Sequence, residues 1–373
     1  MQKRRVKGSF KHPKRQIRSG SREAAPLSKE FLKKRIIPID IEGINTISGM
    51  LSAFHNTSFQ SRNLARCVEI FKKMLEDPDE PKVFLGLAGA MIPAGMKKVI
   101  STMVKRKMVD VIVTTGANAY HDLVESFGYY HYKGSPEVDD AELYQRRIDR
   151  IYDTFADEEK YRLVDRKIVA LADKIRTENV DVTSMPSREF LHDLGGLIDR
   201  EGLKDEKESS FVWNCWRHNV PIFVPALADS SIGLGLTQHY IKFLREGVRP
   251  LGIDQIKDNH EIFEIKRTAK KTGVIYIGGG VPKNYIQQTA YLEDMFGIPD
   301  RGHDYGFQIT TDRPEWGGLS GCTFKEGVSW GKEKHTGEFV TCYCDATIAL
   351  PLIVKAVLER LGNAPAMKRR TER

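Results

Sequence analysis

One lysine of the sequence, Lys332, has neighbours suited to covalent chemistry. It follows Trp330 and a glycine, with Glu326 six residues upstream and Asp345 thirteen residues downstream. A lysine amine is a poor nucleophile at its free pKa of about 10.4, but desolvation yields a neutral amine that can attack an imine carbon. Trp330 could then supply an apolar wall or a ring face for a substrate cation. On spacing alone, a surface turn with a solvated lysine is the simpler explanation.

The elements that must position this lysine follow a repeated pattern. Four short apolar runs are each followed by small or hydroxyl-bearing residues, and helical spacing is expected at 94–106, from about His121 and from about Lys283. Strands that alternate with helices indicate an α/β fold, with a mostly parallel, Rossmann-like sheet and helices on both faces. Such sheets bind ligands beyond the carboxyl ends of their strands. The predicted strands are 83–87, 109–113, 220–224 and 274–277.

The loops after these strands favour a nucleotide. None contains a complete G-x-G-x-x-G motif, but four small-residue loops at strand ends support one another. Glycine-rich turns that lead into helix N-termini suit a pyrophosphate, because backbone N–H groups and the helix dipole favour anions. The alternative is that 278–280 only allows close packing between helix and sheet.

Outside this pattern, the sequence predicts helical and loop segments. Apolar spacing indicates helix within 48–75, and a charged stretch at 141–176 is typical of a solvated helix. Ser187 is a candidate N-cap, and the glycine-rich segment 310–327 is predicted to be a long functional loop. A helix at 349–361 closes the fold.

The charge of the chain is concentrated at its ends. Residues 1–35 carry a net charge of +11 and 368–373 carry +3, which leaves −6 of the total of +8 for the remainder. We therefore expect a basic, disordered tail at 1–35, one domain at 36–365 and a basic tail at 366–373. An organellar presequence at the N-terminus is an alternative. Nucleic-acid binding by this tail is disfavoured because aromatic residues do not alternate with its bases.

Cysteine usage and hydropathy favour a cytoplasmic protein. The five cysteines are an odd, scattered set, and the pair Cys342 and Cys344 has no second pair at metal-ligand spacing. No metal site is therefore expected, and this pair is predicted to lie in a strand. No apolar stretch approaches the length of about 20 residues that a membrane span needs.

Several segments resemble the deoxyhypusine synthase family, in the same order along the chain. The segment 328–332 with 343–346 resembles the family's active-lysine region, and 59–63, 84–86, 108–115, 221–229 and 278–280 also resemble it. The resemblance runs from about Ile37 to Leu361. It implies an NAD-dependent enzyme in which Lys332 forms a covalent imine, with Trp330, Glu326 and Asn284 at the substrate. The residues it implies for NAD are Thr114, Thr115, Gly116, Asp229, Gly279, Gly280, Thr311, Ser320, Asp345 and Ala346. His121 stands where the family has an acid and could hydrogen-bond a hydroxyl of the cofactor in its place.

The resemblance also implies a reaction and an assembly. Members of the family use NAD to move an aminobutyl group from spermidine to a protein lysine, and the retained cofactor reduces the final imine. They form tetramers with active sites between subunits, so a homotetramer is expected here.

The sequence departs from the family pattern at positions that bind the substrate or the cofactor in the family. Tyr120 and His121 replace two adjacent acids, Leu234 and Leu319 replace substrate carboxylates, and Asn284 replaces a histidine. Fewer acids mean less compensation for a buried polycation. The sequence therefore favours a related transferase of a polyamine or other amine, such as a homospermidine-forming enzyme. True deoxyhypusine synthase and a non-catalytic NAD or polyamine binder are the alternatives.

Overall fold

The computed structural model describes residues 32–299 and 301–362. The chain divides into a first unit, Met1–Ile37, and a second unit, Pro38–Arg373. Of the first unit the structure describes 32–37, which is exposed and has no helix or strand. The predicted basic tails lie almost entirely outside the described residues. No helix in the described part of the chain is long and apolar enough to cross a membrane.

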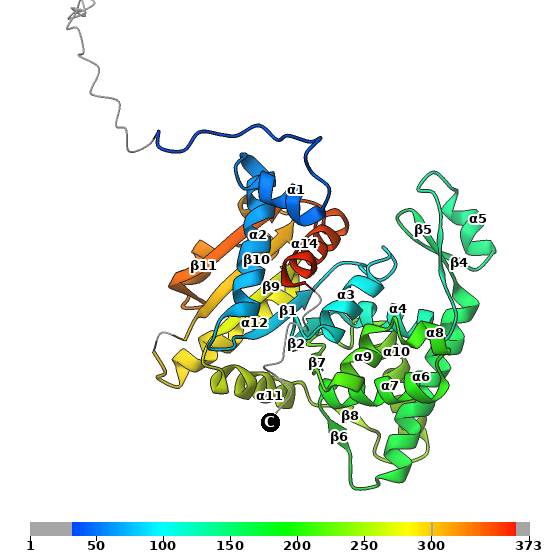
Figure 1. The fold of residues 1–373 in the computed structure, drawn as a ribbon. Coiled ribbons are helices and arrows are strands. Elements are labelled where there is room, and N and C mark those ends of the chain that lie inside the picture. The colour runs from blue at the N-terminus through cyan, green and yellow to red at the C-terminus, as the bar shows by residue number, and fades with distance from the viewer. Residues whose placement is uncertain (1–31, 300, 363–373) are drawn as a thin grey trace, which may run out of the picture. The chain divides into compact units, whose positions relative to one another are not determined.

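A six-stranded sheet forms the centre of the second unit (Figure 1). All five strand pairs in it are parallel. The strand order is β11-β10-β9-β1-β2-β7, so the winding reverses between β1 and β9, as in doubly wound nucleotide-binding folds. The strands are β1 (Lys82–Leu87), β2 (Val111–Thr114), β7 (Ile222–Phe223), β9 (Thr272–Ile277), β10 (His303–Thr310) and β11 (Glu333–Tyr343).

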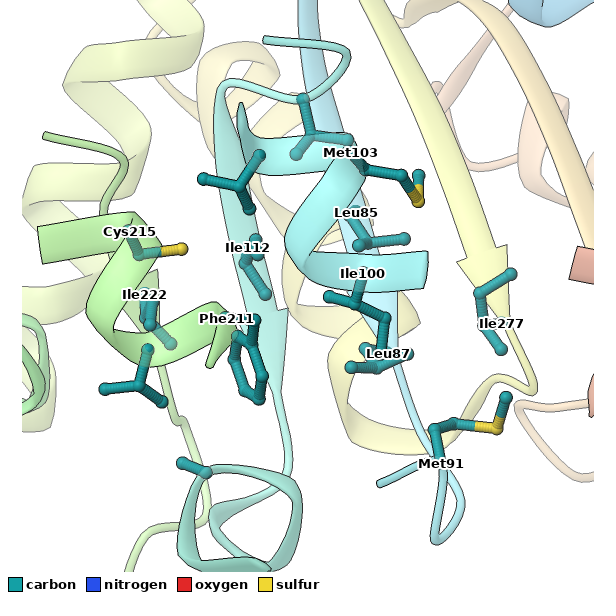
Figure 2. Packing of buried hydrophobic residues seen from close by; sticks show 14 of the residues in the cluster. Leu85, Leu87, Met91, Ile100, Met103, Ile112, Phe211, Cys215, Ile222 and Ile277 are labelled. Carbon is teal, nitrogen blue, oxygen red and sulfur yellow. The ribbon is translucent and has the colours of Figure 1, made fainter. Parts of the chain in front are cut away.

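The sheet has apolar residues on both faces, which explains why helices cover each face. Successive side chains of a strand point to opposite faces, so Phe84 and Leu85 belong to different core clusters although both are fully buried. On the Leu85 face, α3 (Lys97–Lys105) contributes Ile100, which lies near Leu87, and Met103, which lies nearer Leu85 (Figure 2). That face also carries α2 (Phe59–Glu76) and α14 (Ala346–Leu361), and the Phe84 face carries α11 (Gln255–Thr268) and α12 (Gly280–Met295).

Helices also pack beyond β7 and extend the Leu85 core. Phe211, Cys215 and Ile222 lie together at this end of the sheet (Figure 2). The helices of this region are α4 (Gly116–Ser126), α6 (Glu158–Glu178), α7 (Ser187–Glu201), α9 (Phe211–His218) and α10 (Ser231–Arg245).

Short elements complete the fold. A three-stranded sheet is formed by β3 (His131–Lys133), β5 (Thr154–Asp157) and β4 (Ile148–Ile151), and a two-stranded sheet by β6 (Ser184–Met185) and β8 (Gly252–Ile253). The remaining helices are α1 (Ile47–Phe54), α5 (Asp140–Gln145), α8 (Lys204–Lys207), the 3₁₀ helix η1 (Pro314–Trp316) and α13 (Phe324–Val328).

The predicted α/β fold, with a mostly parallel sheet and helices on both faces, is confirmed, and all four predicted strands are present in part or in full. The prediction of one charged helical stretch at 141–176 is wrong, because the antiparallel strands β4 and β5 interrupt it. The predicted loop 310–327 contains η1 and part of α13, and the helix expected from His121 already begins at Gly116.

Ser187 is not an N-cap. Pro186 occupies that position, and the Ser187 hydroxyl instead accepts a hydrogen bond from Val224 N at 3.1 Å. This bond ties the start of α7 to the end of β7.

Candidate active site

The predicted cofactor residues gather at one edge of the sheet. Thr114 ends β2, the glycines 278–280 follow β9, Thr311 follows β10, and Asp345 follows β11. Parallel strands have their carboxyl ends at the same edge, so these loops are neighbours there. The β2 and β9 loops flank β1, next to the point where the winding reverses and where ligands bind in such sheets. Asp229 lies in the loop from β7 to α10 and is exposed.

Three helix N-termini face the same edge and attract negative charge. The helices α4, α12 and α14 begin directly after the loops of β2, β9 and β11. Thr115 caps α4 by accepting from Asn118 N, and Asp345 caps α14 by accepting from Thr347 N at 2.8 Å. Hydrogen bonds from Thr347 hold the pKa of Asp345 below its usual range, so an exposed carboxylate stands at this edge. Helix N-termini suit a pyrophosphate, and carboxylates suit ribose hydroxyls.

The β9 turn needs glycine because another loop lies directly against it. A Cβ on Gly279 would lie 2.4 Å from the Cα of Ser320, a contact that no side chain tolerates. Ser320 Oγ accepts from Gly280 N at 3.0 Å, which ties the loop before α13 to the start of α12. Gly278 and Gly280 have φ of +71° and +57°, values that favour glycine. The structure thus brings Gly279, Gly280 and Ser320 together.

His121 belongs to a buried hydrogen-bond network that sequence analysis missed. Its Nδ1 lies 3.0 Å from Nε2 of His131, whose Nδ1 lies 2.8 Å from Glu125 Oε1. The Tyr161 hydroxyl lies 3.1 Å from both histidines. Burial, together with His131, lowers the pKa of His121 to about 4, so this ring is neutral at neutral pH. A neutral imidazole has one N–H donor and one acceptor nitrogen, so the His121 ring has a second nitrogen, Nε2, for a further hydrogen bond.

Lys332 approaches this edge from the opposite end of the sheet. It directly precedes β11, and Glu333 pairs with His303 at the start of β10. The Lys332 amine nevertheless donates to Asn284 Oδ1 at 3.1 Å, on the second turn of α12. Because α12 begins at Gly280, this helix connects the amine to the predicted cofactor edge.

The turn that carries Lys332 is held by its own backbone. Lys332 N donates to Gly327 O at 3.0 Å, and Thr323 Oγ1 caps α13 by accepting from Glu326 N at 3.1 Å. The amine lies 5.5 Å from the centre of the Trp330 ring, within cation–π range. Trp330 is 58% exposed in the single chain, and Glu326 is exposed as well, so both face outward beside the lysine.

Sequence analysis also missed the polar groups buried beneath Lys332. Lys283, fully buried, donates to Gln308 Oε1 at 2.9 Å and to the carbonyl of Cys322. Glu333, also buried, accepts from Gln287 Nε2 at 2.6 Å. Their hydrogen-bond partners lie 25 to 46 residues away in sequence, so the sequence alone could not show that they are buried and paired. The one available indication was position: Glu333 follows Lys332, and Lys283 precedes Gln287 by one helical turn.

Two leucines mark where this site departs from the predicted family pattern. Leu234, on α10, is 62% exposed, and Leu319, next to Ser320, is 42% exposed. Within the described residues, no group of His, Cys, Asp and Glu is arranged to hold a metal ion.

Comparison with known proteins identifies the family. The family model for deoxyhypusine synthase matches residues 49–357. A probable deoxyhypusine synthase 2 of Methanosarcina acetivorans is 46% identical over 330 residues, which cover 88% of this chain and 91% of that protein. The chain belongs to the deoxyhypusine synthase family. The predicted family resemblance is therefore confirmed.

A bacterial relative and a solved structure agree with this assignment. A deoxyhypusine synthase-like protein of Coxiella burnetii is 38% identical over 339 residues, which cover 90% of this chain and 93% of the relative. A crystal structure described as a "putative deoxyhypusine synthase" from Entamoeba histolytica has a TM-score of 0.55 at 20% identity, over 84% of this chain and 93% of that chain. This similarity supports the fold. Enzymes of the deoxyhypusine synthase family transfer aminobutyl groups from a polyamine.

Proposed function

We propose that the protein is an NAD-dependent transferase that moves an aminobutyl group from a polyamine to an acceptor amine through an imine on Lys332. One observation carries the proposal: the Lys332 amine binds Asn284 on the helix that starts at the glycine-rich turn of β9.

The residues at the carboxyl edge fit NAD. The three helix N-termini would hold the pyrophosphate, with Gly279 and Gly280 allowing its close approach. Asp229, Asp345 and His121 would bind hydroxyls, and Thr114, Thr115, Gly116, Thr311, Ser320 and Ala346 would line the rest of the site. Bound NAD would supply the hydride acceptor for the donor carbon and the hydride for the final reduction.

Within this proposal, Lys332 is the nucleophile. Its neutral amine attacks the imine carbon of the oxidised donor and takes over the aminobutyl group as the donor's remaining amine departs. Asn284 orients the amine by accepting its hydrogen bond. Trp330 provides a ring face for a cationic substrate, and Glu326 an outward carboxylate for its ammonium group.

A small amine or polyamine is the favoured acceptor. Leu234 and Leu319 cannot pair with ammonium groups, so the substrate should carry fewer buried charges than spermidine bound in the pattern of the family. Formation of homospermidine is one specific reaction of this kind, in which a small amine accepts the aminobutyl group. Modification of a translation-factor lysine is the second candidate, favoured by the relatives named as deoxyhypusine synthases.

We also propose a homotetramer in the cytoplasm. The resemblance to the family implies this assembly, and the exposed Trp330, Leu234 and Leu319 are the side chains that we propose a second copy covers. The proposed domain, 36–365, contains every residue of the site.

Incubation of the purified protein with NAD and a panel of amines, followed by mass spectrometry, tests the proposal. An NAD-dependent aminobutyl transfer product from a polyamine supports it. The second candidate predicts transfer to a translation-factor lysine instead, and a protein that binds NAD or polyamine without any product is a non-catalytic binder.

A further inference from the structure

A buried polar cluster lies beneath the candidate active site. Lys283 and Tyr276 belong to it, as do Gln287 and Glu333, and each of the four is at most 2% exposed. Three polar atoms of the cluster have no hydrogen-bond partner among the described residues: Glu333 Oε2, Gln287 Oε1 and the Tyr276 hydroxyl. Burying polar atoms without hydrogen-bond partners is destabilising, so a cluster of this kind calls for a functional explanation.

The Asn284 amide, which contacts the Lys332 amine, cannot act as its general base. Asn284 accepts a hydrogen bond through its amide oxygen, and an amide does not take up a proton at neutral pH. An amine that forms an imine must nevertheless release a proton, and a leaving amine must receive one. A titratable group other than Asn284 is therefore needed within reach of the Lys332 amine.

Glu333 follows Lys332 in the chain, and the charge of the Lys332 amine acts on its carboxyl. Asn284 and Gln287 stand three residues apart on α12, a spacing that brings side chains to about 5–6 Å between their Cβ atoms. Asn284 binds the Lys332 amine and Gln287 binds the Glu333 carboxylate, so the same face of the helix holds both groups. The four-carbon stem of Lys332 allows its amine to move between these neighbouring positions.

We propose that Glu333 exchanges the proton of Lys332 during transfer. This inference rests on the proposed function, and it assigns to Glu333 the acid–base role for which Asn284 is unsuited. As Lys332 Nζ forms its bond to the imine carbon, the Glu333 carboxylate takes a proton from Nζ. The same carboxyl then gives that proton to the donor nitrogen, which accepts the electron pair of the breaking C–N bond and leaves as a neutral amine.

The environment of Glu333 suits this exchange. Burial raises the pKa of its carboxyl to about 7, although Gln287, Lys283 and Lys332 each favour the charged form. A general base works best when its pKa lies near the working pH. Two further titratable groups lie near the carboxyl, one on β9 and one in the loop before α13, and four more line a cavity of about 150 Å³ that Glu333 also lines. These groups are Tyr276, Cys322, Asp294, Arg301, Lys334 and His335.

The test is the pH profile of the Glu333→Gln variant. Glutamine can still accept from Gln287 but cannot take up a proton, so kcat should fall by about 10²–10⁴-fold, and the acid limb near pH 7 should disappear. Glu338→Gln is the matched control, since Glu338 is exposed on the same strand and pairs with Lys73. This control variant should keep the kcat of the natural protein and the acid limb of its pH profile.

A second variant covers the case in which Glu333→Gln does not fold. Gln287→Leu removes the hydrogen bond that favours the charged carboxyl, so the acid limb should move to higher pH. A carbon-13 NMR titration of labelled glutamate follows the same carboxyl without turnover and should show a midpoint near 7 that Gln287→Leu raises.

The possible failures can be told apart. A Lys332 adduct in the natural protein, together with an unchanged limb in Glu333→Gln, would overturn the inference and leave the proposed function standing. Absence of any Lys332 adduct during turnover would overturn the proposed function itself. A carboxyl midpoint far below 7 would overturn the assignment of Glu333 whatever the rates.

Discussion

Lys332 and Glu333 are adjacent in the chain but differ in environment. Lys332 is half-buried with its amine at Asn284, whereas Glu333 is fully buried with one oxygen bound to Gln287. A buried carboxyl beside a nucleophile also affects the free energy of folding, because its protonation differs between the folded and unfolded states.

The Glu333 carboxyl should make stability fall as pH rises. Its pKa of about 7 in the folded protein exceeds the value of about 4.3 in an unfolded chain, so its stabilising contribution is complete below pH 4.3 and is lost as pH rises through 7. The loss amounts to roughly 4 kcal/mol. Between pH 5 and 8, Glu333→Gln should therefore lose less thermal stability than the natural protein. Identical pH dependence of the two melting temperatures would contradict this.

At the scale of elements, the sequence predicts best what depends on neighbours in the chain. The strand β1 was predictable because its apolar residues are contiguous and a small-residue loop follows them. The strands β4 and β5 were missed because IDRI and TFAD mix charged and apolar residues within a charged stretch. Glu333 was missed for a tertiary reason: its burial depends on α12, 46 residues upstream.

The turn after β9 gives a prediction at the same scale. Gly279→Ala should weaken NAD binding by at least about tenfold, because the new methyl group meets the Ser320 backbone and one of the two loops must move. Titration calorimetry with NAD measures this. Gly252→Ala is the control, since a Cβ there comes no closer than 3.6 Å to its neighbours. Unchanged affinity in Gly279→Ala would place the cofactor elsewhere.

At the scale of the whole molecule, the ends of the chain are strongly basic, whereas the domain between them carries a net negative charge. We predict that deletion of 1–30 leaves the melting temperature and NAD affinity almost unchanged, because this highly charged segment cannot bury much apolar area. Thermal unfolding and NAD titration of the truncated protein test this. Loss of transfer activity on truncation would show instead that the segment reaches an active site.

Substrate choice also belongs to the scale of the assembled molecule. Converting Leu234 and Leu319 to Asp should shift the preference among donors and acceptors toward more highly charged polyamines such as spermidine, because each new carboxylate can pair with an ammonium group. The ratio of kcat/KM values for spermidine and a smaller diamine measures the shift. An unchanged ratio would mean that these positions do not contact the substrate.

Trapping of the covalent intermediate tests the central claim most directly. Borohydride added during turnover with NAD and a polyamine should reduce the imine and leave an aminobutyl adduct on Lys332 alone, as mapped by peptide mass spectrometry. Lys332→Arg should form no adduct and transfer nothing while still binding NAD, because a guanidinium stays protonated. An adduct on another lysine, such as the buried Lys283, or near-normal transfer by Lys332→Arg would contradict the account.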